Sequence, residues 1–138
     1  MRKPRPIQGE YRGVARMTED FPLLEEAHAT PMTREDALAL VSLVCEAEGL
    51  TIPPVQFRKG SPGRSDWKRI LLPSDPLPRG GFQQTGYLRA GIVLHELAHY
   101  VIARERLREV KPAPTIPHGP RFVRTLDRLT RETECLWC

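Results

Sequence analysis

The stretch His95-Glu96-Leu97-Ala98-His99 constrains this chain more than any other part of the sequence. Two residues four positions apart lie on the same face of an α-helix, roughly 6 Å apart along its axis, so both imidazoles can reach one metal ion. Glu96 lies about 100° around the helix from His95 and reaches the same place without being a ligand. The pattern is typical of zinc hydrolases, in which the glutamate accepts a proton from a zinc-bound water and delivers it to the leaving group.

The residues around this motif are apolar. Ala90–Leu94 precede it and Val101–Ala103 follow it, so a helix over about 90–107 should be apolar nearly all round and buried in the core. Burying two histidines and a glutamate is costly unless something compensates them, and a metal ion does so. The alternative interpretation is a pair of hydrogen-bonded core histidines beside a salt-bridged glutamate.

A catalytic zinc takes three protein ligands and keeps one position for water. The third candidate is His118, which precedes Gly119 and Pro120. Proline is well tolerated at the first position of a helix, and apolar residues then recur at helical spacing, so we expect a helix over about 120–134 with His118 just ahead of it. A solvent-exposed loop histidine is the alternative. The rival third ligands are Glu105, Glu109 and Asp127.

The HExxH helix followed by His118-Gly119-Pro120-Arg121-Phe122 resembles the SprT-like zincin metallopeptidases, and most closely a small group of HExxH…HGPxF metallohydrolases from actinobacteria and phages. The resemblance covers about residues 33–134 in the order of their elements. It implies that His95, His99 and His118 bind Zn²⁺ and that Glu96 is the catalytic acid and base. It also implies an extended substrate added as a strand to the edge of a small sheet.

The connection from His99 to His118 is long and rich in proline, so an inserted loop should overhang the cleft. Relatives that act at DNA–protein crosslinks usually add DNA-binding elements, often a zinc ribbon. This sequence has no complete ribbon, because Cys135 and Cys138 supply only half of a tetrahedral zinc site. We expect a structurally unimportant tail there. A half-site completed by another subunit and an adventitious disulfide are the alternatives.

The rest of the chain predicts an α+β fold, a minimal zincin-like domain. Thr33 should cap a helix that ends near Gly49. Strands are expected at 52–59 and 67–72, joined as a hairpin, with a third at 82–88, in a small antiparallel sheet. The predicted division is a flexible basic segment at 1–30, the metallopeptidase domain at 31–134 and the CxxC tail at 135–138.

Composition limits the partners. The sequence has no run of 18 apolar residues and no secretory leader, and its three cysteines suit a reducing compartment, so we expect a cytoplasmic protein without a membrane partner. Lysine and arginine number 21 against 17 acidic residues. Part of the excess lies in the N-terminal segment. A second set follows the motif and is interleaved with acidic residues, which favours a solvated mixed-charge face over a nucleic-acid surface: Arg104, Arg106, Arg108, Lys111, Arg121, Arg124, Arg128 and Arg131.

The sequence therefore predicts a zinc-dependent metallopeptidase that cuts a protein or peptide substrate. The alternatives are a zinc hydrolase of a non-peptide substrate and a metal-containing, DNA-associated regulatory or binding module. An intact Glu96 argues against a purely structural zinc, which has no use for a base and would be closed by a fourth ligand. Tyr87 and Tyr100 are candidates for stabilising the oxyanion, although core packing is the favoured role of Tyr100.

Overall fold

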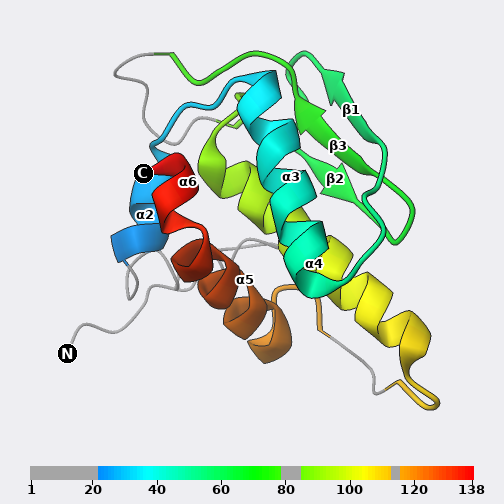
Figure 1. Ribbon diagram of the computed structural model, residues 1–138. Helices are drawn as coiled ribbons and strands as arrows, with labels where there is room; N and C mark the ends of the chain where they lie inside the picture. Colours follow the sequence, from blue (N-terminus) through cyan, green and yellow to red (C-terminus); the bar gives the residue numbers. More distant parts are fainter. Residues whose placement is uncertain (1–21, 79–84, 113–115) are drawn as a thin grey trace.

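The computed structural model describes residues 22–78, 85–112 and 116–138 (Figure 1). In these residues the chain forms five helices and a three-stranded sheet, which confirms the predicted α+β class. The elements follow in the order α2 (Pro22–His28), α3 (Arg34–Glu48), β1 (Val55–Arg58), β2 (Arg64–Ser65), β3 (Ile70–Pro73), α4 (Ala90–Arg108), α5 (Pro120–Glu132) and α6 (Glu134–Trp137).

Helix α4 is the centre of the fold. Figure 1 shows it crossing the molecule with the sheet on one side and α5 on the other. Helices α2, α3 and α5 and strands β2 and β3 all pack against it. Every residue from Ala90 to Ala98 is buried, as the apolar flanks of the motif predict. The histidine motif is therefore fixed by contacts on all sides rather than carried on a surface helix.

Helix α3 has the predicted ends. The Thr33 hydroxyl accepts a hydrogen bond of 3.0 Å from the amide of Asp36, which satisfies one of the free N–H groups of the first turn. Gly49 ends the helix in the left-handed region at φ 69°, where a side chain would be strained. The face between these ends is buried against the core through Ala37, Leu40, Val41, Val44 and Cys45.

The sheet has the order β1-β3-β2 and is mixed rather than wholly antiparallel. Strand β1 pairs with β3 in parallel, with Val55 opposite Ile70, so the predicted hairpin between these two segments is wrong. The chain reverses at Asp66 instead, whose carboxylate accepts hydrogen bonds from the amides of Lys68 and Arg69. The antiparallel hairpin is thus formed by β2 and β3.

The expected third strand at 82–88 lies partly outside the described residues. Within the described part, Leu88 makes only an isolated bridge to Pro76. Residues 22–28, at the end of the segment expected to be flexible, form α2, with Leu24 and Ala27 buried in the core; residues 1–21 of that segment lie outside the described residues. No helix among the described residues is both long and apolar enough to cross a membrane.

The C-terminal tail packs against α5. Residues 134–137 form α6, and Trp137 is buried with its indole N–H donating to the Thr133 hydroxyl at 3.1 Å. The two thiols of the CxxC sequence are exposed, and the thiol of Cys138 lies 3.4 Å from a carboxylate oxygen of Glu26. Trp137 thus fixes the tail on the end of α5, and Cys138 lies beside a residue of α2; the cysteine pattern indicated neither contact.

Candidate metal centre

Three histidine side chains converge at the middle of α4. The Nε2 atoms of His95 and His99 lie 3.2 Å apart, and each lies 3.1 Å from Nε2 of His118. His95 and His118 are buried, with 5% and 9% of their surface exposed, and His99 is half-buried. The structure thus brings together the three histidines that the sequence singled out. Among the described residues they are the only cluster of side chains with suitable ligand atoms.

The triangle fits a tetrahedral metal ion. Three nitrogens at 2.0–2.1 Å from an ion in tetrahedral geometry are about 3.3 Å apart, close to the observed separations. Hydrogen bonds cannot explain the triangle equally well. An imidazole nitrogen either carries a proton or offers one lone pair, so three Nε2 atoms cannot all satisfy one another. The residues present therefore fit a metal ion bound through three imidazoles.

The protonation states suit metal binding. Burial lowers the pKa of His95 well below its usual value, and the neighbouring His99 and His118 lower it further. Burial, and then His118, lower the pKa of His99 to about 4. Both imidazoles are therefore neutral at pH 7 and hold a free lone pair, which is the form that binds metals.

His118 is held in an unusual backbone conformation. It is the one non-glycine residue with positive φ in the described parts of the chain, at 59°. The amide of Gly119 donates to the carbonyl of Ile116 at 2.8 Å, and a Cβ at position 119 would lie 2.9 Å from that oxygen. A left-handed residue costs about 1–2 kcal/mol, and such strain persists where surrounding contacts impose it. The tight turn aims His118 at α4.

Phe122 packs against all three imidazoles. Its ring centroid lies 5.0 Å from that of His95, 4.5 Å from His99 and 4.7 Å from His118. Phe122 is buried one helical turn after His118, on the inner face of α5. It therefore holds the rings in place and closes one side of the centre to water.

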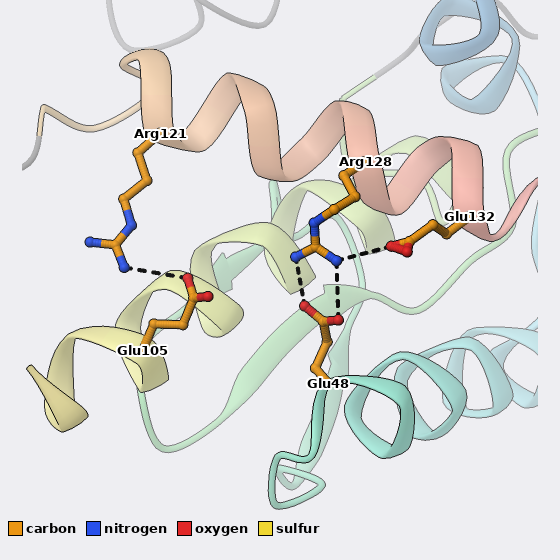
Figure 2. Close-up of polar contacts among 5 residues, drawn as sticks. All are labelled: Glu48, Glu105, Arg121, Arg128 and Glu132. Carbon is orange, nitrogen blue, oxygen red and sulfur yellow. Dashed lines mark hydrogen bonds and ion pairs between the residues drawn. The ribbon is translucent and has the colours of Figure 1, made fainter.

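Ion pairs tie α5 to the two helices beside it (Figure 2). Arg121 reaches Glu105 at 3.3 Å and Glu109 at 2.8 Å, which fixes the start of α5 on α4. Arg128 pairs with Glu48 at the end of α3 at 2.6 Å and with Glu132 at 2.9 Å. Two of the three rival ligands, Glu105 and Glu109, are therefore engaged in ion pairs with Arg121.

Asp127, the last of the rivals, pairs with Arg131 at 3.1 Å. None of the three carboxylates belongs to the cluster of ligand atoms formed by the histidines. His118 is thus the third candidate ligand that the described residues support. Glu105 of α4 and Glu109, which follows its last residue, instead hold the start of α5 through Arg121, and with it the turn that carries His118.

Glu96 lies in a cleft beside the histidines, with 4% of its surface exposed. The hydroxyl of Ser65 donates to its Oε1 at 2.8 Å and lies 3.1 Å from its backbone carbonyl. Gly63 approaches the other oxygen so closely that a Cβ there would lie 2.9 Å from Oε2. A two-residue strand and a glycine therefore fix the carboxylate of Glu96.

The sequence analysis missed these two residues. Residues 60–65 have the composition of a turn, and no local pattern connects them with a glutamate 31 positions away. The glycine after Pro62 was a usable signal, because glycine at a turn also marks sites where another group approaches the backbone closely. The two tyrosines considered for the oxyanion are not among the cleft residues: the Tyr100 hydroxyl donates to the carbonyl of Thr51 at 2.5 Å, in the core.

The cleft has a volume of about 620 Å³. Its walls come from the end of β1, the following turn and β2 on one side, and from the histidine centre on the other. None of the described residues between His99 and His118 lines the cleft. Residues 113–115 of the predicted overhanging loop lie outside the described residues.

No model of a known protein family matches the chain, and no curated protein or solved structure matches it. The resemblance to SprT-like metallopeptidases therefore rests on the HExxH and HGPRF motifs of the sequence alone. The chemistry of the site is the basis for assigning a function.

Proposed function

We propose that this protein is a zinc-dependent peptidase related to the SprT-like zincins. One observation carries the proposal: three imidazole nitrogens at metal-binding spacing share a cleft with the buried carboxylate of Glu96. A structural zinc site is closed by four protein ligands, whereas here three converge and the cleft opens beside them. This arrangement suits a site that receives water and substrate.

His95, His99 and His118 would hold the ion through Nε2. Zinc bound there supplies a Lewis acid that polarises the scissile carbonyl and makes water acidic enough to attack at neutral pH. Glu96 accepts the proton of the attacking water and then delivers it to the departing amine. Ser65 keeps the carboxylate in a fixed orientation, so the proton transfers occur without first ordering the base.

The decisive experiment combines metal analysis with a matched variant. Protein purified without added metal is expected to contain one zinc per chain and to hydrolyse unfolded proteins or peptides. Glu96→Gln keeps the shape and the three ligands but removes the proton acceptor, so it should keep its zinc and lose about 10²–10⁴ in rate. A variant as active as the wild type would contradict the mechanism.

Two other functions predict different results. Failure of the zinc-loaded wild type on broad protein and peptide panels, together with cleavage of ester or amide substrates by a Glu96-dependent route, would favour the non-peptide hydrolase. Failure on every substrate, with salt-sensitive DNA binding that survives Glu96→Gln, would favour the DNA-associated module. Assays with and without DNA separate these outcomes.

A further inference from the structure

The basic residues that line the cleft do not belong to the set that follows the HExxH motif in the sequence. Its walls carry Arg58, Lys59 and Arg64, from the end of β1 to the start of β2, and none of the basic residues on α4 or α5. All three side chains are exposed. They lie within seven positions of one another, on the wall that also supplies Ser65 to Glu96.

These three cations differ in their partners from three of the four arginines of α5. Arg121, Arg128 and Arg131 each pair with carboxylates of the same fold. In the described ranges, by contrast, no carboxylate lies within ion-pair distance of Arg58, Lys59 or Arg64. Among the described residues that line the cleft, Glu96 has the only carboxylate, and the Ser65 hydroxyl already donates a hydrogen bond to it.

We propose that the cleft selects acidic peptide segments, with Arg58, Lys59 and Arg64 binding carboxylate side chains of the substrate beside the bond that is cut. The proposal rests on the peptidase function above and names its substrate class. Among the described residues that line the cleft, three cations stand against the one carboxylate of Glu96, so its potential is positive, which attracts anions and disfavours basic segments.

The size of the cleft favours a peptide over a nucleic acid. A volume of about 620 Å³ is typical of sites for small ligands and suits a few residues of an extended chain. Proteins that bind duplex DNA bury roughly 1,000–2,500 Å² and contact many phosphates, whereas three cations would give a salt dependence of only about −2.7 in log–log slope. The three cations line a pocket rather than form an extended track.

A binding experiment tests this without requiring hydrolysis. Three fluorescent probes are titrated into zinc-loaded, full-length Glu96→Gln protein. Two are peptides of equal length, one with several glutamates and its twin with glutamines, and the third is a single-stranded oligodeoxynucleotide of the same net charge as the glutamate peptide. We expect the glutamate peptide to bind about tenfold more tightly than its twin at low salt. The difference should shrink in 1 M NaCl, where the Debye length is about 3 Å.

The variants Arg58→Gln, Lys59→Gln and Arg64→Gln, alone and combined, should each reduce the preference for the glutamate peptide. Arg124→Gln is the matched control, because Arg124 is an exposed arginine of α5 that does not line the cleft, and its removal changes net charge by the same amount. It should leave the preference intact. In the wild type, kcat/KM on the two peptides should show the same ranking, mainly through KM.

Three results would overturn the proposal. The first is equal binding of the glutamate and glutamine peptides. The second is a preference that Arg124→Gln reduces as much as the cleft variants do, which would indicate a general charge effect. The third is an oligonucleotide that binds more tightly than the glutamate peptide and is weakened by the cleft variants, which would assign the wall to nucleic acid. Loss of hydrolysis with the binding preference intact would instead count against the peptidase function alone.

Discussion

The Ser65 hydroxyl donates a 2.8 Å hydrogen bond to Oε1 of Glu96, so strand β2 is joined directly to the glutamate of the HExxH motif. The same hydroxyl lies 3.1 Å from the backbone carbonyl of Glu96. The sheet therefore does more than cover α4. Its shortest strand orients the side chain that the mechanism needs as a base.

Removing this hydroxyl should slow the reaction without releasing the metal. A hydrogen bond to a charged group is worth about 1.5–3 kcal/mol, so Ser65→Ala should lower kcat by roughly tenfold or more, with zinc content unchanged. Ser65→Thr keeps the hydroxyl and should recover most of the rate. Steady-state kinetics with metal analysis of each variant would measure both effects. Equal loss in the alanine and threonine variants would show that packing, not the hydrogen bond, matters.

Gly63 is expected to tolerate no side chain. Its φ of +89° is left-handed, and a Cβ would lie 2.8 Å from Cδ1 of Ile92 and 2.9 Å from Oε2 of Glu96. Gly63→Ala should cost about 1–2 kcal/mol in backbone strain, as any L-residue would there, plus about 1–3 kcal/mol from overpacking.

Gly60 supplies the control for this prediction. It also has a positive φ, +75°, but a Cβ there would meet nothing within 4 Å. Gly60→Ala should therefore cost only the backbone term. Urea unfolding of the two variants measures the difference, and equal losses would mean that the close approach to α4 has no energetic effect.

The third ligand can be tested by metal content. His118→Ala removes one of three converging nitrogens, so zinc affinity should fall by more than the roughly 100-fold that loss of an outer hydrogen-bond partner costs. Glu105→Gln and Asp127→Asn are matched controls that should retain zinc, because their carboxylates pair with arginines. Full zinc occupancy in His118→Ala, measured after dialysis against a chelator, would remove His118 from the site.

The sequence predicted those parts of the site whose geometry is local. Spacing along one helix determines where His95 and His99 point, and the cap residues Thr33 and Gly49 determine the ends of α3. The turn that holds His118 is also local, because it is closed by the hydrogen bond from Gly119 to Ile116. These features depend on residues within a few positions of one another, so they could be inferred directly from the chain.

The features that the sequence did not reveal depend on contacts between distant segments. Strand β2 is two residues long and lies between a glycine turn and the Asp66 turn, so it has no periodicity of its own. The parallel pairing of β1 with β3 places Val55 opposite Ile70, so it joins segments that no local pattern connects. The cationic wall of the cleft was missed for the same reason, since arginines near a turn resemble an ordinary solvated loop until the fold places them beside Glu96.

His28 should make stability depend on pH. It is buried against Gly91 of α4, accepts a hydrogen bond of 3.3 Å from Arg89 at Nδ1 and is within electrostatic reach of His95. Burial, and then the charge of Arg89, lower the pKa of His28 to about 3. Below pH 6.5 the unfolded chain binds this proton and the folded chain does not, so the free energy of unfolding falls as the pH drops from about 6.5 to about 3.

The slope from this one group should approach 1.4 kcal/mol per pH unit within that window and vanish above it. His28→Gln removes the titrating group and leaves the histidines of the metal centre unchanged. The difference in unfolding free energy between the wild type and this variant, measured by urea denaturation of both metal-free proteins across the window, isolates the contribution of His28. A difference that does not vary with pH would show that the folded state takes up the proton as readily as the unfolded chain.

The pair formed by Arg128 and Glu48 should contribute more to stability than the other ion pairs of α5. Both guanidinium nitrogens engage the two carboxylate oxygens, at 2.6 Å and 3.1 Å, and Glu48 is only 20% exposed, so the pair joins the end of α3 to α5 with bidentate geometry. A double-mutant cycle with Arg128→Ala and Glu48→Ala should give a coupling near 1 kcal/mol at low salt. The pair Arg131–Asp127, an i,i+4 contact within one helix, should give about 0.3–0.5 kcal/mol in the same experiment.

Both couplings should weaken in 1 M NaCl, and the exposed pair should weaken more because salt screens exposed charges best. Equal couplings would mean that the bidentate geometry and lower exposure of the Arg128–Glu48 pair add nothing to its strength.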